Sequence, residues 1–509
     1  MSSNDPNHEN EEDYLQADDA EEVFERGEDD EMEMDGDYDE NMTIEDEITF
    51  QNDSAAHFDS HTDSVFCVAQ HPVHNHIIVT GSGDDTGYIF DSTPAPRPVL
   101  PSSFETTPQP REREALQPLA KLDGHTDTIN AVAFTEPAGE YVITAGLDGK
   151  LRAYRDTTPK KTGTAWEFFG EAQEVEEINW MAVCPYQKNS EEHKNVIAIG
   201  ANDGSAWVFR LDHTSANPIS IIQTFFSHTE SCTAGAWTSD GNLLATVSED
   251  GSFYVYDVFG AAAAAGIEYP AGTSVVLGLT ADDQRFAVPG GLYSIAISPS
   301  GGIAALGGGE GNIRVIGLPR ITASGPSAKG KAAPKSAGAT AAGTIMAALQ
   351  NQTDNIESLS FSQPPFTFLA AASVDGSLAI YDAAHRFAVR RHIQGAHDDA
   401  PVVKVEFLPS NRQLSASVSG PLASASAAQQ NRSWMFTSVG LDGVVRRWDA
   451  RGGTTAAAQG LMQEWKGHMP LTENEDGEQS GGIMGFVQNY EGQRIVTAGD
   501  DGICLVFEE

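Results

Sequence analysis

Histidine and aspartate recur in this sequence as widely spaced pairs. His61 precedes Asp84 by 23 residues, and His125 precedes Asp148 by the same distance. A His–Asp pair can act as an acid–base couple in an enzyme, but it can also form a buried hydrogen-bonded pair that holds a fold together. Because the pair recurs along the chain, a repeated structural role is favoured over a single catalytic centre. Further members are His228 with Asp250, and His397 and His468 at longer distances before Asp442 and Asp501.

Other chemical signatures are weak. No G-x-S-x-G, H-E-x-x-H or Walker-type motif is present, and the glycine-rich stretch Gly307–Gly311 lacks the Lys-Ser/Thr that a phosphate-binding loop needs. The four cysteines stand in apolar, strand-like runs without a C-x-x-C pair, which favours buried thiols over a metal site or a disulfide framework. We therefore predict a protein that is not an enzyme and that has no cofactor and no bound metal.

Short hairpins must position the His–Asp pairs. In "ITAGLDGKLRAY", small residues lead into Asp148-Gly149, and the aromatic Tyr154 follows six residues after the aspartate. Asp-Gly between alternating hydrophobic residues is the strongest short-range hairpin signal, because the turn needs positive φ. Eight copies of this pattern are present, two of them degenerate, and their turn residues are Asp84, Asp148, Asp203, Asp250, Glu310, Asp375, Asp442 and Asp501.

This repeat resembles that of WD-repeat β-propellers, in which each blade contributes four strands. The resemblance implies an all-β, eight-bladed propeller. It also implies that histidine, turn aspartate and a strand Ser/Thr share hydrogen bonds, as His125–Thr144–Asp148 and His228–Thr246–Asp250. The usual tryptophan is present only at Trp448, so packing should hold the other blades. The predicted structural residues are His61, Asp84, His125, Asp148, Asp203, His228, Asp250, Asp375, Asp442, Trp448, His468 and Asp501.

The C-terminal strand predicts how the ring closes. Ile503–Phe507 reads as a strand, and the last blade would lack its outer neighbour, although exposed sheet edges are normally covered. Ile48–Gln51 is the first β-like run after the acidic N-terminus, so we expect it or its close neighbours to complete the eighth blade. We predict residues 1–43 to be a disordered acidic tail, because charge is high and hydrophobicity low there. Residues 44–509 then form the propeller, with the closing strand near 48–51.

Charge predicts the kind of partner. Residues 1–50 hold 22 acidic side chains and one basic one, Arg26, and so carry −21 of the formal net charge of −44. Contact with phosphates needs Lys and Arg, so we expect no direct binding of nucleic acid, and a strongly cationic protein suits the field better. No run is long and apolar enough to span a membrane, and no signal peptide is evident. We expect a monomer in the cytoplasm, with the nucleus as a further location.

The resemblance to WD-repeat propellers also indicates a binding face. Partners of that class mostly bind the end that carries the turns and the loops into the inner strands. Acids dominate the corresponding positions here, and adjacent negative fields attract a cationic segment. Any single one of these acids could instead be a loop residue that is exposed to solvent and has no partner role. The two candidate aromatic anchors, Trp180 and Tyr293, could instead belong to the core. The predicted partner-binding residues are Asp63, Asp127, Glu176, Glu177, Glu230, Glu249, Glu310, Glu357, Asp398, Asp399 and Asp500, with Trp180 and Tyr293 as candidate aromatic anchors.

The first repeat is the most diagnostic. "DSVFCVAQHP", followed by "IIVTGSGDDTGYIFD" behind an acidic N-terminus, resembles the angio-associated migratory cell protein family. That family includes the fungal dedicated chaperone of the large-subunit ribosomal protein L10 (the uL16 class). The resemblance implies a ribosome-assembly chaperone that shields the basic N-terminal segment of its newly made client until incorporation into the pre-60S particle. Asp127, Glu177, Glu249 and Glu357 are the acids that we expect to carry most of this contact.

Two alternatives share parts of this pattern. Trp448–Arg451 reads Trp-Asp-Ala-Arg, which resembles the WDxR box of substrate receptors of cullin-type ubiquitin ligases. A structural role is the other interpretation of the same four residues, with the tryptophan inside a strand. A nuclear scaffold that binds basic histone tails would use the same acidic face as the chaperone. Only the identity of the bound segment separates those two functions.

Overall fold

The computed structural model describes most of the chain beyond its acidic N-terminus. The predicted tail and residues 48–50 lie outside the described part, so the boundary between residues 43 and 44 stays a prediction. No helix in the described part is long and apolar enough to cross a membrane. The described residues are 51–94, 113–158, 163–188, 190–267, 269–270, 272–321, 342–364, 367–409, 432–452, 460–473, 479–490 and 492–509.

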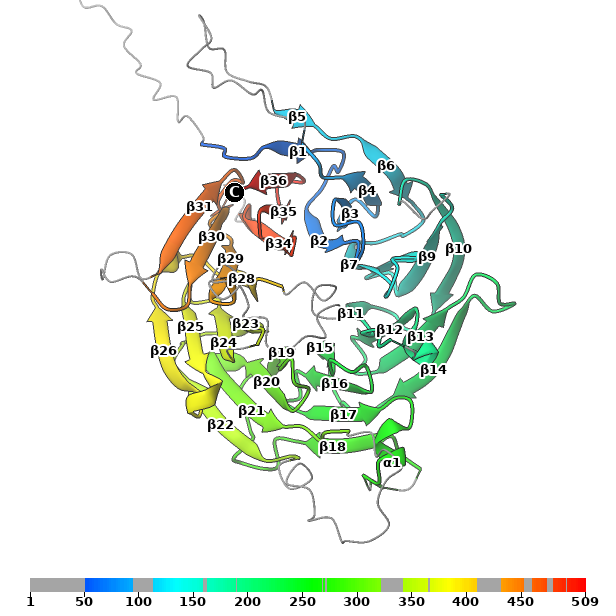
Figure 1. Cartoon of the computed structure of the whole chain (residues 1–509), viewed down its shortest axis with the longest axis vertical. Coiled ribbons are helices and arrows are strands. Elements are labelled where there is room, and N and C mark those ends of the chain that lie inside the picture. The colour runs from blue at the N-terminus through cyan, green and yellow to red at the C-terminus, as the bar shows by residue number, and fades with distance from the viewer. Residues whose placement is uncertain are drawn as a thin grey trace, which may run out of the picture. The chain divides into compact units, whose positions relative to one another are not determined.

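Eight sheets of four or five strands surround a central opening, which confirms the predicted eight-bladed propeller (Figure 1). In blade 1 the order from centre to rim is β2 (Val65–Gln70), β3 (Ile77–Ser82), β4 (Gly87–Asp91) and β6 (Pro118–Leu122). In each of blades 2 to 7, the four strands likewise follow one another in chain order from the centre to the rim. The middle strands are buried from end to end, as in β3 and in β8 (Tyr141–Gly146), because neighbouring blades pack on both of their faces.

The remaining elements have the following bounds. Blade 2 contains β7 (Ile129–Phe134), β8, β9 (Lys150–Asp156) and β10 (Trp166–Gln173); blade 3 contains β11 (Ile178–Val183), β12 (Val196–Ala201), β13 (Ala206–Leu211) and β14 (Ile219–Phe225); blade 4 contains β15 (Cys232–Trp237), β16 (Leu243–Ser248), β17 (Phe253–Asp257) and β18 (Val275–Leu279). Blade 5 contains β19 (Leu292–Ile297), β20 (Ile303–Gly308), β21 (Asn312–Gly317) and β22 (Ile345–Gln350); blade 6 contains β23 (Ile356–Phe361), β24 (Phe368–Ser373), β25 (Leu378–Asp382) and β26 (Ala388–Ile393); blade 7 contains β28 (Val402–Phe407), β29 (Met435–Gly440), β30 (Val444–Asp449) and β31 (Leu461–Lys466). Short elements are β27 (Ala396–Asp399), β32 (Thr472–Glu473), β33 (Gln479–Ser480), α1 (Ala261–Ala264), η2 (Glu191–His193), η3 (Gly309–Gly311) and η4 (Ala383–His385).

Blade 8 joins the two ends of the described chain. Its strands β34 (Ile483–Gln488), β35 (Arg494–Gly499) and β36 (Cys504–Glu508) are completed by β1 (Ala56–Phe58), which pairs antiparallel with β36. The predicted closure by an N-terminal strand is therefore confirmed. A fifth strand, β5 (Glu114–Ala115), pairs in parallel with β1 and covers the edge.

The predicted position of the closing strand was wrong. Gln51, the described end of the predicted segment 48–51, lies outside any strand, and the strand itself begins at Ala56. The physical reason is packing. Ala56 and Phe58 are fully buried, and the Phe58 ring stacks on Phe90 of blade 1 with centroids 4.3 Å apart. β-propensity favours the run at residue 48, but only side chains that fill the space between blades 8 and 1 can close the ring.

Glycine in the turns brings neighbouring blades together. Gly149 follows the turn aspartate of blade 2 at φ 71°, and a Cβ at this position would lie 2.1 Å from the carbonyl oxygen of Val175, just before blade 3 begins. Gly311 approaches Gln352 in the same way between blades 5 and 6. These contacts place each turn beside the loop that enters the next inner strand, so turns and entry loops share one end of the propeller.

Candidate functional site

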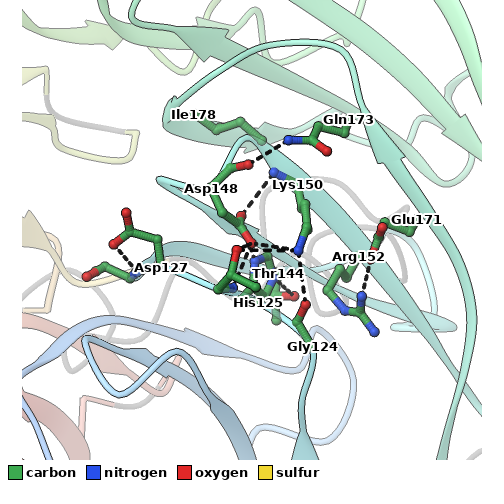
Figure 2. Close-up of polar contacts among 12 residues, drawn as sticks. Gly124, His125, Asp127, Thr144, Asp148, Lys150, Arg152, Glu171, Gln173 and Ile178 are labelled. Carbon is green, nitrogen blue, oxygen red and sulfur yellow. Dashed lines mark hydrogen bonds and ion pairs between the residues drawn. The ribbon is translucent and has the colours of Figure 1, made fainter.

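The histidine of blade 2 forms the predicted network. His125 Nδ1 lies 3.0 Å from Asp148 Oδ1, and its Nε2 lies 2.8 Å from Thr144 Oγ1, while the Thr126 N–H donates to Asp148 (Figure 2). Burial lowers the pKa of His125, although Asp148 opposes this. Desolvation works against ionisation of Asp148, yet hydrogen bonds from His125 and Thr126 keep the pKa of its carboxyl low. A neutral histidine beside an ionised aspartate is a stable structural pair.

Blades 1, 7 and 8 contain the same network. In blade 7, His397 contacts Asp442 at 2.8 Å and Ser438 Oγ at 2.7 Å, and Trp448 Nε1 donates to the same hydroxyl at 2.8 Å. The predicted role of Trp448 is therefore confirmed. The equivalent contacts in the other two blades are His61 with Asp84 and Thr80, at 3.0 and 2.9 Å, and His468 with Asp501 and Thr497, at 2.9 and 2.7 Å.

Blade 4 departs from the predicted network. His228 Nε2 lies 2.7 Å from Thr246 Oγ1 as expected, but its Nδ1 lies 2.6 Å from the hydroxyl of Ser252. Asp250 is 3.9 Å away and instead accepts hydrogen bonds from the backbone of Thr229 and Ser252. The predicted network of His228, Thr246 and Asp250 therefore contains a further member, because the hydroxyl of Ser252, two residues after the aspartate, takes the position beside His228 Nδ1.

These networks exclude the catalytic interpretation. The five histidine side chains are fully buried, with an exposed fraction of 0% each, so a substrate could not reach them. All four cysteines are free, and burial raises the pKa of the three fully buried thiols, as well as that of Cys67. Within the described ranges, no three His, Cys, Asp or Glu side chains are arranged to hold a metal ion.

Two blades without a histidine use other groups. In blade 6, Gln352 replaces the histidine and donates to Ser377, while Asp375 accepts from the Thr353 N–H at 2.7 Å. In blade 3, Glu174 stands four residues before the inner strand, as His125 does in blade 2. Among the described residues, Asp203 accepts hydrogen bonds from Ser205 of its own turn alone, and it stays exposed. Its predicted structural role is therefore limited to that turn.

The predicted acids lie at the turn-bearing end of the propeller. Backbone atoms of Asp63, Glu176, Glu230 and Asp398 pack against the turn glycines of the preceding blades. The first three stand two residues before their inner strands and so occupy equivalent places in the ring, whereas Asp398 stands four residues before β28. The predicted acids with exposed side chains are Asp63, Asp127, Glu176, Glu177, Glu230, Glu249, Glu310, Glu357, Asp398 and Asp399, whereas Asp500 and Tyr293 are half-buried. We call this end the acidic face.

One part of the acidic face is a pocket. Glu176 and Glu177 line a cavity of ≈ 600 Å³ at the boundary of blades 2 and 3. Glu174 and Asp203 line it too, although the sequence indicated no partner contact for them. The signal that could have found them is the missing histidine of blade 3, which leaves this place open to solvent.

A second group of acids surrounds Tyr293. Its hydroxyl donates to the carbonyl of Gly290 at 2.6 Å. Desolvation raises the pKa of Tyr293, and the charges of Glu249, Glu357 and Glu230 raise it further. Desolvation also raises the pKa of Glu357, and the negative charge of Asp354 raises it further. The structure therefore brings three of the predicted acids into one negative field around Tyr293.

Three of the predicted partner-binding residues, Trp180, Asp500 and Asp398, interact with other parts of the propeller. Trp180 is 9% exposed and packs so closely on Gly200 and Gly235 that a Cβ on either would overlap its ring. It belongs to the core, and its prediction as a partner anchor was wrong. Spacing places it in an inner strand but does not tell which side it faces. The Asp500 carboxylate accepts from the Gly481 N–H at 2.6 Å, and Asp398 lies 4.0 Å from Arg446.

The Trp-Asp-Ala-Arg segment has a structural explanation. Trp448 is buried, and Asp449 accepts hydrogen bonds of 2.7–3.1 Å from the Arg451 guanidinium. This arrangement favours the structural interpretation of the motif over a ligase-adaptor contact.

A bulge at the start of every inner strand was missed by sequence reasoning. In β2, Val65 and Cys67 have successive partners in β3, so Phe66 is the extra residue. Bulges re-aim a side chain, and a register shift stands at this position in all eight blades. Glu357 was among the acids predicted near the start of an inner strand, but no sequence pattern indicated the bulge itself. The bulged residues are Phe66, Asn130, Asn179, Thr233, Tyr293, Glu357, Val403 and Met484.

Known proteins share this architecture. The family described as WD domain, G-beta repeat matches residues 52–91, 116–155 and 219–257. The crystal structure of Chaetomium thermophilum Sqt1 bound to the N-terminus of the ribosomal protein L10 is 46% identical to this chain. The structural match covers 90% of this chain and 100% of the Sqt1 chain, with a TM-score of 0.72.

Two curated proteins are more distant. The ribosome assembly protein SQT1 of Saccharomyces cerevisiae is 27% identical over 237 residues, which are 45% of this chain and 48% of that protein. The chain therefore matches about half the length of this relative. The angio-associated migratory cell protein of Homo sapiens is 23% identical over 467 residues, which are 90% of this chain and 80% of that protein.

Proposed function

The chain belongs to the WD-repeat propeller family that includes Sqt1 and the angio-associated migratory cell protein, and we propose that it is a dedicated ribosome-assembly chaperone. Its client would be a newly made large-subunit ribosomal protein of the L10 class. The acidic face would bind the basic N-terminal segment of that client. The 46% identity to Chaetomium thermophilum Sqt1, whose crystal structure holds the N-terminus of the ribosomal protein L10, supports this client.

The single observation that carries the proposal is the separation of two kinds of acid. Turn aspartates such as Asp148 and Asp442 are paired with buried histidines, and their side chains are at most 10% exposed. Acids such as Asp127, Glu177, Glu249 and Glu357 stay exposed at the same end of the propeller. Solvated carboxylates that share one face attract a cationic segment over a distance of roughly one Debye length, about 8 Å at physiological salt.

The mechanism needs binding and release without catalysis. A basic, RNA-binding segment adheres to any polyanion, so a client that is not yet assembled needs a partner that shields its charge. Carboxylates on the acidic face would supply that shielding, and burial against the propeller would exclude competing polyanions. Release follows where ribosomal RNA offers a denser negative field. We propose the cytoplasm, where ribosomal proteins are made, as the main place of action.

Capture by a peptide tests the function. The probe is the N-terminal segment of ribosomal protein L10, and the variant combines Glu177→Lys with Glu357→Lys. We expect its affinity to fall by about tenfold or more, because each change puts a cation where the peptide's own charges must lie. Affinity of the unchanged protein should also fall with added salt.

The matched control changes the same charge elsewhere. Glu191 and Glu192 are exposed in η2, in the loop between the two innermost strands of blade 3 and thus at the end opposite the turns. Glu191→Lys with Glu192→Lys should leave capture nearly unchanged. Equal loss in both double variants would show that only net charge matters. Undiminished capture by the Glu177→Lys/Glu357→Lys protein would refute the proposed face, and tighter capture of a histone-tail peptide would favour the nuclear scaffold.

A further inference from the structure

Five of the eight bulged residues form two groups. In blades 2 to 4 the bulged side chain bonds to the next blade: Asn130 donates to the Ile178 carbonyl at 2.5 Å, and Thr233 donates to the Leu292 carbonyl at 2.7 Å. Asn179 likewise donates to the Cys232 carbonyl at 3.2 Å. These three side chains join blades, so their hydrogen-bonding capacity is directed to the propeller itself.

Blades 1 and 5 carry aromatic residues at the same position. Phe66 in β2 is 37% exposed, and Tyr293 in β19 is half-buried. A bulge takes its residue out of the alternation that directs side chains into a blade, and neither ring is fully buried. Blades 1 and 5 are four apart in a ring of eight, and β2 and β19 face each other across the central opening (Figure 1).

Acidic residues stand near both aromatic positions. A Cβ placed on Gly83 would lie 3.1 Å from Asp63 Oδ2 and 3.3 Å from the Phe66 ring, so both side chains border the same point. On the opposite side, the backbone of Glu249 packs on Gly291, two residues before Tyr293. Glu357 occupies the bulged position of the next blade, as Tyr293 does in blade 5. The charges of Glu249, Glu357 and Glu230 also raise the pKa of the Tyr293 phenol.

We propose that Phe66 and Tyr293 are two arginine-binding anchors on opposite sides of the opening, and that they make the acidic face select arginine over lysine. This inference rests on the proposed function and names what the face recognises. A guanidinium is planar, so it can stack on an aromatic ring while its edge donates to a carboxylate. A lysine ammonium is a compact, strongly hydrated charge and gains less from the ring. Two anchors across one opening require two arginines in the bound segment.

Two peptides of equal charge test the inference. One is the N-terminal segment of ribosomal protein L10, and the other is the same peptide with every arginine replaced by lysine. The full-length protein should bind the arginine peptide about tenfold more tightly. In the variant with Phe66→Leu and Tyr293→Leu, this preference should fall to about twofold or less, while affinity for the lysine peptide stays nearly unchanged. Leucine keeps apolar bulk, and thermal melting verifies that the variant is folded.

The control and the contrary outcomes separate the two proposals. Tyr490 is 36% exposed in the loop between β34 and β35, at the end opposite the turns, so Tyr490→Leu should keep the full preference. Equal binding of both peptides by the unchanged protein, or an undiminished preference in the double variant, would overturn the anchors and leave the proposed function standing. Failure of the unchanged protein to bind either peptide would overturn the proposed function itself.

Discussion

Blade 7 buries a histidine at the place where blade 3 exposes a glutamate. His397 contacts Asp442 and Ser438, and Trp448 completes the network from the neighbouring strand. In blade 3, Glu174 occupies the entry position before the inner strand, and both it and Asp203 are exposed and line a pocket. The strand order and the antiparallel pairing are the same in the two blades.

The difference shows that a blade does not need the polar network to keep its place. Blade 3 shares a continuous apolar core with blade 2, in which Ile178, Ile197 and Phe209 pack with Ile143 and Leu151. Because apolar burial holds the strands, the polar positions at the turn end are available for another task. In blade 7 they stabilise the fold, and in blade 3 they add negative charge to the acidic face.

The largest expected effect is on stability, and it compares His397 of blade 7 with Glu174 of blade 3. His397→Ala should lower the free energy of unfolding by about 3 kcal/mol, because it removes one hydrogen bond from the buried Ser438 hydroxyl and one from the Asp442 carboxylate. Trp448 and Arg446 remain among the partners of these two groups. Glu174→Ala, at the corresponding position of blade 3, should cause almost no loss. Urea denaturation of both variants measures the two values. A loss from Glu174→Ala as large as that from His397→Ala would show that blade 3 contains an equivalent network.

A smaller effect on stability should distinguish Trp448 from Tyr381, the aromatic residue at the same repeat position in blade 6. Trp448→Phe removes one buried hydrogen bond to Ser438 and should cost about 1 kcal/mol. Tyr381 of blade 6 is the matched control, since its buried hydroxyl has no hydrogen-bond partner within the described ranges. Tyr381→Phe should be neutral or slightly stabilising, because it removes an unsatisfied polar group. Thermal melting compares the two, and similar losses would contradict the assigned role of Trp448.

Acidification should weaken the contribution of His397. Burial lowers the pKa of His397 in the folded protein, against the opposing effect of Asp442, so the unfolded chain binds this proton first as pH falls. The stability supplied by a neutral His397 is present above about pH 6.5 and is lost as pH falls below that value. The difference in unfolding free energy between the unchanged protein and His397→Ala should therefore shrink from pH 7 to pH 5. A difference that is constant or grows would contradict the neutral, buried histidine.

The smallest expected effect concerns the pocket of blade 3. Glu174→Gln with Asp203→Asn removes two of the negative charges that line one cavity, so like-charge repulsion falls and the melting temperature should rise slightly at low salt. At high salt, screening should abolish the gain. The same measurement on Glu191→Gln with Glu192→Gln serves as the control. A marked loss of stability in the pocket variant would show that these acids hold blade 3 together.

Local chemistry made the blades predictable. Asp-Gly turns and alternating apolar residues depend on neighbours in sequence, so eight such hairpins predicted eight blades even though Glu310 and Asp85 depart from the pattern. The closing strand was placed too early, because the fit of Phe58 against Phe90 involves residues from two different blades. Trp180 was misjudged for the same kind of reason, since its surroundings include Gly235 of the next blade.

The acidic face was predictable in composition but not in arrangement. Resemblance to a repeat family gave the positions of acids such as Glu177 and Glu357, whose exposure the structure bears out. It did not reveal that Ser252 replaces Asp250 beside His228, because hydrogen-bond geometry decides between two nearby oxygens. Contact of these residues with a partner remains the subject of the proposed experiments.

The sequence by itself determined the number of blades, the turn residues and the excess of acid, because φ restrictions and charge are properties of each short segment. Only the tertiary structure decided which N-terminal strand closes the ring and where Phe66 and Tyr293 lie. The reason is that strand register and bulges depend on the partner strand and on the neighbouring blade. Residues that share one end of the propeller are far apart along the chain, and only the packing of the blades brings them to one face.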